Sequence, residues 1–461
     1  MTSSMYKSLL WVIALMFFPI TVRFLGFDAF TTATAAIYLL FAWFFVRTPA
    51  LFQRTHFPRV ILGLLLLSVL STISIEGEFF SASFRRFFAS CAGFLLFYMV
   101  ANSNARLASD EQGHRIEQLL SFILYLYAVQ LLIGFAIYFV PEVGRYFAIF
   151  TTRDVDLLES SVTDTVKRMT SIILPREAVG EIVAVLTPIV LYKLLAKGNA
   201  RYYVILAIYF LGVTLSATRS GFLLFFFAVF LYTLAVLPMI KLPTWSIFIV
   251  VAGVSAPVAF IMFPDLFKPI MHRMSEFFQV YEESESLAVA INRAGVWYYV
   301  VEILMPNISL WGNGFLTIHE GVSINFHNLY ATVFHRHGVI GFVLFFYIFY
   351  KIVKSLMKAR RHAAAQADKA LIYACLTSIV VLLINEIKYE FIRQPSYQQT
   401  IWVLLGVYFL VALYLSNRRK SAEGGGRTEP RPRSRTGGLL AKYGYRDDVR
   451  SQGTEQAKGA Q

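Results

Sequence analysis

Apolar runs of about 20 residues recur along most of this chain and are separated by shorter polar stretches. A helix of that length crosses the hydrocarbon core of a bilayer with its backbone polar groups hydrogen-bonded internally. The pattern therefore predicts an all-α polytopic membrane protein with about twelve transmembrane helices. The predicted spans cover residues 9–26, 28–46, 60–75, 87–101, 116–140, 178–196, 202–217, 222–238, 244–263, 326–350, 370–387 and 400–416.

Basic residues orient the predicted spans. Lys7 precedes the first span, which lacks a small-residue cleavage site, so we expect a retained helix rather than a signal peptide. Further basic residues fall in every second connection, which the positive-inside rule assigns to the cytoplasm. This orientation predicts two cytoplasmic termini and two long external loops, residues 141–177 and 264–325. Function is expected in these loops. The orienting residues are Arg47, Arg54, Arg59, Arg106, Arg115, Lys193, Lys197, Arg201, Lys351, Lys354, Lys358, Arg360 and Arg361.

Composition separates a membrane domain from a tail. Of the 461 residues, 57% are hydrophobic and 15% are charged, which is more apolar and less charged than soluble domains are. The net charge of +14 does not indicate a nucleic-acid partner, because the basic residues follow the predicted cytoplasmic side. Residues 417–461 are rich in Gly, Pro and Arg and have no apolar period. We predict a membrane domain over residues 1–416, in contact with membrane lipids, and a disordered basic cytoplasmic tail.

The two cysteines, Cys91 and Cys375, lie inside apolar runs. They provide neither a disulfide framework nor a zinc site. No metal and no cofactor is expected.

The stretch FHNLYATVFHRHGVIGF, residues 326–342, carries titratable groups where a predicted span begins. If that helix ends near Lys351, His327 lies ~36 Å above its end and outside the hydrocarbon core. His327 would share a helix face with Gly338 and Gly341, which we interpret as a close-packing seam. An imidazole there can exchange a proton near neutral pH, or simply tolerate an interfacial position. The spacing to the later histidines disfavours a metal site.

One motif within this stretch resembles a known pattern. His327 and Asn328 are followed by nine residues, LYATVFHRH, and then by Gly338 and Gly341. This arrangement resembles the motif of the bacterial O-antigen ligases and, less strictly, of the related O-antigen and exopolysaccharide polymerases.

Two other segments look similar to the same family. LSATRSGFLLFFF places Arg219 in a short external turn between two predicted spans. INRAGVWYYVVEILMPNISLWGNGF places Arg293 in the second external loop, followed by Trp297 and by the turn from Gly312 to Gly314. The order Arg, Trp, Gly-x-Gly and His-Asn is that of the family.

The resemblance covers roughly residues 205–350 and implies a GT-C-like bundle in the bacterial inner membrane. It implies inverting, metal-independent transfer of a glycan from undecaprenyl pyrophosphate to a sugar hydroxyl on the periplasmic face. Arg219 and Arg293 would bind the pyrophosphate, since guanidinium groups bind phosphate in bidentate fashion. His327 would take the proton of the attacking hydroxyl. The acceptor is lipid A core in a ligase and a growing polysaccharide in a polymerase.

Five further residues are candidates for substrate binding. Glu177 resembles a glutamate that many of these polymerases carry, as an alternative base or acceptor-binding group, or it only complements a helix N-terminus. Arg168 and Arg176 flank it and would widen a basic surface for phosphate. Asn328 belongs to the motif, and Tyr330 lies one turn from His327, where it either orients the imidazole or packs in the core.

The two arginines also have simpler interpretations. Arg219 would extend to the lipid headgroups at a turn. Arg293 would pair with Glu282, Glu283 or Glu285 in the loop.

A transporter or lipid-linked sugar flippase is the competing class of protein, for which twelve spans would be ordinary. Transporters place charged residues near the bilayer midplane on broken helices. Arg219, Arg293 and His327 are all predicted at the outer surface instead, which favours a transferase.

Overall fold

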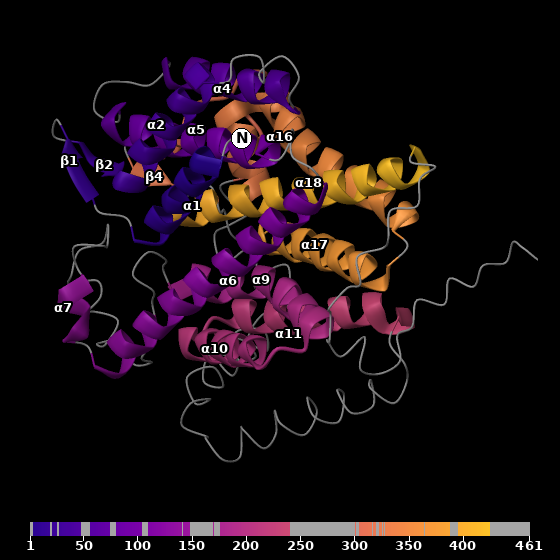
Figure 1. Cartoon of the computed structure of the whole chain (residues 1–461). Helices are drawn as coiled ribbons and strands as arrows, with labels where there is room; N and C mark the ends of the chain where they lie inside the picture. The colour runs from indigo at the N-terminus through magenta and orange to yellow at the C-terminus, as the bar shows by residue number, and fades with distance from the viewer. Residues whose placement is uncertain are drawn as a thin grey trace, which may run out of the picture.

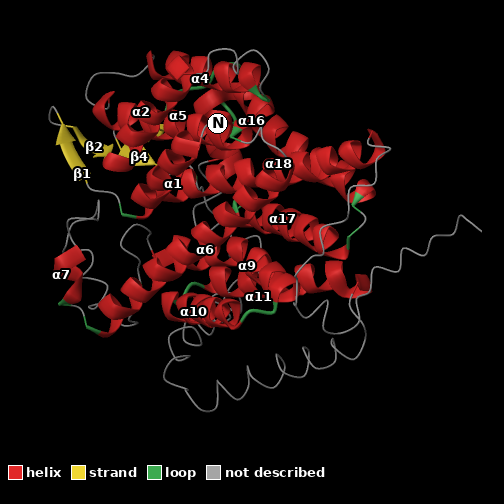
Figure 2. Ribbon diagram, viewed as in Figure 1, coloured by secondary structure: helices red, strands yellow, loops and turns green. Residues whose placement is uncertain are grey.

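The computed structural model describes residues 3–18, 21–24, 27–47, 56–73, 80–103, 109–140, 142–147, 169, 176–239, 300, 304–315, 317–319, 322–324, 326, 328–363, 365–387 and 395–424. This part of the chain is mainly helical, with two short β-hairpins (Figure 2). Its helices are α1 (Ser3–Phe17), α2 (Thr32–Arg47), α4 (Pro58–Ile73), α5 (Phe80–Asn102), α6 (Ser109–Phe139), α7 (Val143–Phe147), α9 (Arg176–Lys197), α10 (Ala200–Ser216), α11 (Arg219–Val236), η4 (Leu237–Met239), α16 (Leu329–His362), α17 (Gln366–Asn385) and α18 (Pro395–Gly424).

The long apolar helices agree with the predicted helical membrane protein. Within the described residues, six helices are long and apolar enough to cross a membrane, and five shorter helices of 10–17 residues are also apolar. Together they correspond to every predicted span except residues 244–263, which lie outside the described residues. The total of twelve spans and their orientation therefore stay predictions.

The first predicted span is too long. Residues 9–26 were expected to form one helix, but α1 ends at Phe17. Strand β1 (Thr21–Phe24) then pairs antiparallel with β2 (Phe27–Thr31) before α2 begins. Apolarity alone could not distinguish the two structures here, because β-branched and aromatic residues also favour strands. A second antiparallel hairpin, β3 (Thr317–His319) and β4 (Val322–Ile324), precedes α16.

The prediction of one continuous helix over residues 326–350 was also wrong. Helix α16 begins at Leu329, continues to His362, and contains a break at Gly338, whose φ is 65° and ψ is −170°. Because the helix is interrupted there, the rise and rotation per residue of a regular helix cannot be used to relate residues on the two sides of the break. The predicted height of His327 and the shared face of the two glycines therefore no longer apply. At the other end of the membrane domain, α18 continues to Gly424, past the predicted start of the tail at residue 417; residues 425–461 lie outside the described residues.

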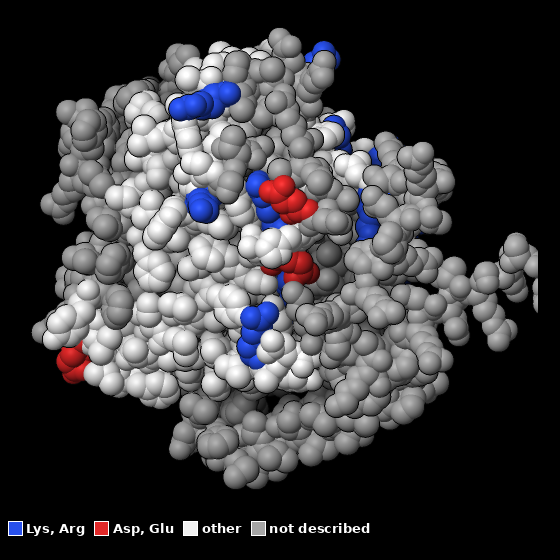
Figure 3. Space-filling view, in the orientation of Figure 1, with Lys and Arg blue, Asp and Glu red and all other residues white. Residues whose placement is uncertain are grey.

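Helices α17 and α18 lie between two groups of helices (Figure 1). One group contains α2, α4, α5 and α16, and the other contains α6, α9, α10 and α11. Helix α9 packs against α10, α11 and α17, whereas α18 packs against α5, α6 and α16. The visible face carries few charged side chains among the described residues (Figure 3). The described candidate site residues lie on α9 and α16 or on elements packed against these two helices.

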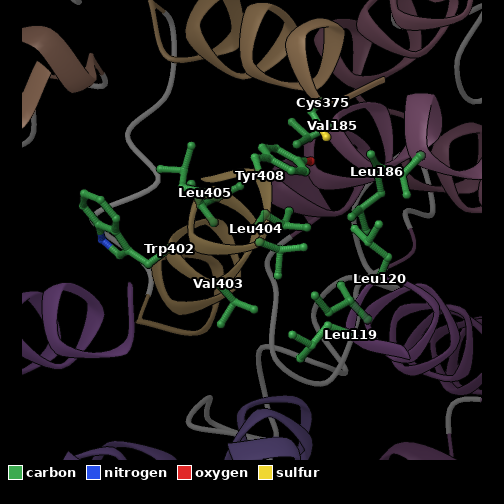
Figure 4. Close-up of a cluster of buried hydrophobic side chains, with 14 of the residues drawn as sticks. Leu119, Leu120, Val185, Leu186, Cys375, Trp402, Val403, Leu404, Leu405 and Tyr408 are labelled. Carbon is green, nitrogen blue, oxygen red and sulfur yellow. The ribbon is translucent and has the colours of Figure 1, made fainter. Parts of the chain in front are cut away.

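Buried side chains join the central helices (Figure 4). The Tyr408 hydroxyl of α18 donates to Ser378 Oγ of α17 at 2.8 Å, and Ser378 donates in turn to the backbone oxygen of Val185 in α9. Trp402 of α18 packs against Phe345 of α16, with 5.4 Å between ring centroids. The core is therefore aromatic and aliphatic, with a few hydroxyls bonded between helices.

Candidate functional site

The break in α16 is occupied by another part of the chain, residues 304–315, which we call the docking loop. Backbone oxygens of Ser309 and Leu310 accept from the N–H groups of Val339 at 3.1 Å and Ile340 at 3.3 Å. A helix segment that starts after a break leaves its first N–H groups without intrahelical acceptors. The docking loop supplies acceptors for two of them.

Two glycines allow this close approach. Gly312 has φ 98° and Gly338 has φ 65°, a region that residues with a Cβ rarely adopt. A Cβ on Gly312 would lie 2.8 Å from the nitrogen of His337, and one on Gly338 would collide with the backbone of Leu310. Gly338 is therefore a contact between a helix and a loop, not part of the predicted seam between helices. Gly341 does face another helix, since a Cβ there would lie 3.4 Å from Leu67 of α4.

Polar side chains hold the shape of the docking loop. Ser309 Oγ accepts from the N–H groups of Trp311 and Gly312, both at 3.2 Å. Asn313 Nδ2 donates to the backbone oxygen of Asn307 at 2.6 Å, and the Asn313 N–H donates to the backbone oxygen of His335 at 2.7 Å. The predicted turn from Gly312 to Gly314 is thus fixed against α16.

Basic side chains lie behind the docking loop. His335, Arg336 and His337 are all buried. The Arg336 guanidinium lies 5.7 Å from the ring centroid of Phe315, at the end of the docking loop, and the His337 ring lies 5.4 Å from the same ring. Arg86 of α5 donates to the Phe315 backbone oxygen at 3.3 Å. The sequence analysis did not identify Arg86, whose only signal is a basic residue at the start of an apolar run.

Asn328 and Tyr330 tie the start of α16 to the end of α17. Asn328 caps α16 by accepting from the Ala331 N–H at 3.0 Å, and its Nδ2 donates to the Ile387 backbone oxygen at 2.8 Å. The Tyr330 hydroxyl donates to the Leu383 backbone oxygen at 2.9 Å. These contacts give both residues a structural role. Their predicted roles in substrate binding stay predictions.

An apolar groove lies beside this junction. It has a volume of about 440 Å³ and lies between the docking loop, the first half of α16 and the end of α17. The side chains of Met305 and Ile308 line it and are exposed. Its other lining residues are Val300, Leu304, Asn328, Tyr330, Ala331, Phe334, Phe342 and Ile387.

Arg219 is the first residue of α11, in a turn that other elements fix. Helices α9 and α11 cross at Gly180 and Gly221, where a Cβ on Gly221 would lie 2.7 Å from the Gly180 Cα. Met169, which follows Arg168 in the sequence, donates its N–H to the Leu215 backbone oxygen at 2.8 Å. The end of the first predicted external loop is therefore bonded beside the Arg219 turn.

Two buried carboxylates near these turns were missed. Glu181 of α9 is 2% exposed, and Ser220 Oγ donates to its Oε1 at 3.4 Å. Glu386, just after α17, is also buried, and its backbone oxygen accepts from the Leu329 N–H at 2.9 Å. A carboxylate within an apolar run is the sequence signal that identifies such residues, because burying one in a membrane is costly.

The remaining candidates are not placed. His327, Arg293 and Arg168 lie outside the described residues, as do the Glu282, Glu283 and Glu285 proposed as partners of Arg293. Arg176 and Glu177 are the first two residues of α9, but their side chains are not described. The predicted roles of Arg293 and His327 in binding and transfer therefore stay predictions.

Within the described part of the chain, no three His, Cys, Asp or Glu side chains are grouped so that they could hold a metal ion. The thiols of Cys91 and Cys375 are both buried and free.

No family model matches this chain. No curated protein matches its sequence either. The resemblance to glycan ligases and polymerases therefore rests on the motif residues quoted above.

Proposed function

We propose that this protein is a membrane glycosyltransferase, similar to the O-antigen ligases, that acts in lipopolysaccharide or surface polysaccharide assembly. Its donor is a glycan on undecaprenyl pyrophosphate, and its acceptor is a sugar hydroxyl on the periplasmic face of the inner membrane. The proposal rests on the motif residues and on one structural observation, the apolar groove beside Asn328.

The groove has the properties that a lipid-linked donor requires. Asn328 and Tyr330 line it at the start of α16, and the exposed Met305 and Ile308 line it from the docking loop. Apolar walls favour a hydrocarbon chain over a free sugar or nucleotide. A lipid chain in the groove would leave its polar head near Asn328, the neighbour of His327 in the motif.

The proposed residues account for the chemistry of transfer. The acceptor oxygen attacks the anomeric carbon of the donor, and the bond from that carbon to the pyrophosphate oxygen breaks with inversion. His327 takes the proton of the attacking hydroxyl. Arg219 and Arg293 bind the leaving pyrophosphate and offset its charge. Because these cations stabilise the leaving group, the reaction requires no metal.

The acceptor distinguishes two forms of this proposal. A ligase transfers the glycan to lipid A core, whereas a polymerase transfers it to another repeat unit of a growing polysaccharide. The complete His-Asn motif with both glycines favours the ligase. The polymerase is the alternative.

The buried carboxylates do not favour the competing transporter or flippase. Glu181 is the sixth residue of α9, so it lies only ~7.5 Å along the axis from the helix start. Glu386 follows the last residue of α17. Transporters hold their coupling carboxylates near the bilayer midplane, whereas these two lie at helix ends.

Reconstitution with a purified undecaprenyl-pyrophosphate glycan, in EDTA, tests the proposal. Each acceptor is supplied in turn. Capped lipid A core identifies a ligase, elongated glycan identifies a polymerase, and no product with either acceptor refutes the transferase. Abolition of transfer by EDTA would refute the metal-free reaction.

The role of His327 is tested with a matched histidine. We expect His327→Ala to reduce transfer at least about a hundredfold, because it removes the proposed base. His114→Ala is the control, since His114 is an exposed histidine of α6. Equal turnover of His327→Ala and wild type would remove His327 from the mechanism.

A further inference from the structure

The buried carboxylate of Glu181 lies next to the proposed anion-binding turn, but the proposed reaction does not use it. Glu181 accepts a hydrogen bond from Ser220, the residue that follows Arg219 in the first turn of α11. The bond joins two helices, α9 and α11. It therefore constrains the turn that carries Arg219.

The neighbouring backbone leaves this turn little room to move. At the crossing of Gly180 and Gly221, even a Cβ would force the two helices apart. Thr218, which precedes Arg219, also lies at this crossing, and its Oγ1 lies 3.1 Å from Ser216 Oγ. Glu181 is next in sequence to Gly180, so its side chain leaves α9 at the closest approach of the two helices.

Two threonine hydroxyls, one in α9 and one in α10, are hydrogen-bonded within their own helix. Thr187 Oγ1 donates to the Val183 backbone oxygen of its own helix at 2.8 Å, and Thr214 does the same with Phe210 at 2.9 Å. Such bonds satisfy a hydroxyl locally and need no carboxylate. The Glu181 carboxylate bears a desolvation cost that core packing does not require.

We propose that Glu181 is a positioning residue: through its hydrogen bond with Ser220 it fixes the first turn of α11, so that the Arg219 guanidinium is preorganised for a pyrophosphate group. This inference rests on the proposed function of Arg219. Preorganisation lowers the entropic cost of binding, because a fixed guanidinium does not have to be ordered by the ligand.

Kinetics of the single variants separate positioning from general destabilisation. We expect Glu181→Ala to raise the KM for the lipid-pyrophosphate donor about tenfold, as the loss of a hydrogen bond to a charged group would, with kcat within about twofold. Ser220→Ala should show the same pattern. Glu181→Gln keeps an oxygen acceptor and should stay within about threefold of wild type. Thr187→Val, which alters a hydroxyl elsewhere in α9, is the matched control and should change neither constant.

A double-mutant cycle tests whether Glu181 acts through Arg219. In the Arg219→Lys background the guanidinium fork is already lost, so adding Glu181→Ala should raise the donor KM by less than about twofold. Binding of undecaprenyl pyrophosphate to the detergent-solubilised full chain is measured in parallel for all variants. A full tenfold effect in the Arg219→Lys background would mean that Glu181 does not act through Arg219 and would overturn the inference.

The outcomes also separate this inference from the proposed function. Transfer and binding by the wild type, with additive effects of Glu181→Ala and Arg219→Lys, would refute positioning and leave the transferase intact. Pyrophosphate binding that shows the coupling, without transfer to either acceptor, would support positioning and refute the transferase. If the wild type neither binds nor transfers, both are wrong. Thermal unfolding of each variant identifies any that fail to fold, and Ser220→Ala then replaces Glu181→Ala in the cycle.

Discussion

Gly312 and Gly338 both have positive φ where the docking loop meets α16. Neither position has space for a Cβ, because each faces backbone atoms of the other segment. Side chains can move away from a clash, but a hydrogen-bonded backbone cannot do so without losing its bonds. At the residue scale, the two glycines therefore allow the docking loop and α16 to come close enough to form hydrogen bonds with each other.

Gly338→Ala should lower the stability of the protein by roughly 2 kcal/mol or more, because it adds both backbone strain and a collision with Leu310. Thermal unfolding in detergent measures the effect. Gly144→Ala is the control, since its Cβ would make only an ordinary 3.5 Å contact with Ile137. Equal melting temperatures for both variants would contradict the arrangement at the break.

His56 is expected to make stability depend on pH. It precedes α4 outside the predicted spans. Its backbone N–H donates to Asn102 Oδ1 at 2.9 Å, and its imidazole ring packs against Phe409. Burial, and secondarily the positive charge of Lys351, lower the pKa of His56 below its usual 6.5. The folded state therefore favours neutral imidazole. The stability that depends on neutral His56 is fully present above the unfolded-state pKa and is lost as the pH falls toward the lowered folded-state pKa.

The measurement compares His56→Gln with wild type. When the pH is lowered from 7.5 to 5, the melting temperature of the wild type should fall further than that of the variant, because residue 56 of the variant does not titrate. An equal fall in both proteins would show that folding does not lower the pKa of His56.

At the element scale, hydropathy predicted most of the helices but not the features that shape the site. Apolar runs located the six long and five shorter apolar helices among the described residues, because crossing a bilayer demands both length and apolarity. The break at Gly338 lies within an apolar run, and its cause is a contact with residues 309–313 that no local pattern encodes. The Gly-x-Gly and Gly-x-x-Gly elements were recognised separately. Only the structure showed that they touch.

The Ser309 hydroxyl should stabilise the docking loop. Ser309→Ala removes the acceptor for two backbone N–H groups and should cost about 1 kcal/mol and speed limited proteolysis within residues 304–315. Ser416→Ala is the control, because Ser416 bonds only the backbone of its own helix, at Ala412. An unchanged proteolysis rate would argue against this role.

A buried ion pair joins α6 and α9. Lys193 has a fully buried side chain and pairs with Glu117, whose side chain is 30% exposed. Glu117→Gln leaves a buried ammonium without its counter-charge and should destabilise the protein by roughly 3 kcal/mol. Lys193→Met leaves only the more exposed carboxylate and should cost less. The double variant should recover part of the loss in thermal unfolding, and purely additive losses would contradict the pairing.

At the scale of the whole molecule, the docking loop and the Arg219 turn are predicted on the same side of the membrane. The apolar helices agree with a membrane protein, but their orientation was inferred from the basic connections alone. Because the thiols of Cys91 and Cys375 are buried, we expect little labelling of the native cysteines, so that introduced cysteines can be labelled selectively. Exposed positions at opposite ends of α16 therefore report the orientation.

Trp311→Cys in the docking loop should react with a membrane-impermeant maleimide added outside spheroplasts. Arg361→Cys, at the far end of α16, should react only after permeabilisation. Both native residues are exposed, so access alone does not distinguish them. The opposite labelling pattern would invert the predicted topology and remove the docking loop from the periplasm.

The shared hydrogen bonds at Gly338 also bear on how the chain enters the membrane during synthesis. Ser309 and Leu310 precede α16 in the chain, so their carbonyl groups leave the ribosome before Val339 and Ile340 do. In the predicted topology, the acceptors have already been translocated when the broken helix leaves the translocon. The open N–H groups at the break can thus be paired upon insertion, without a period of exposure to lipid.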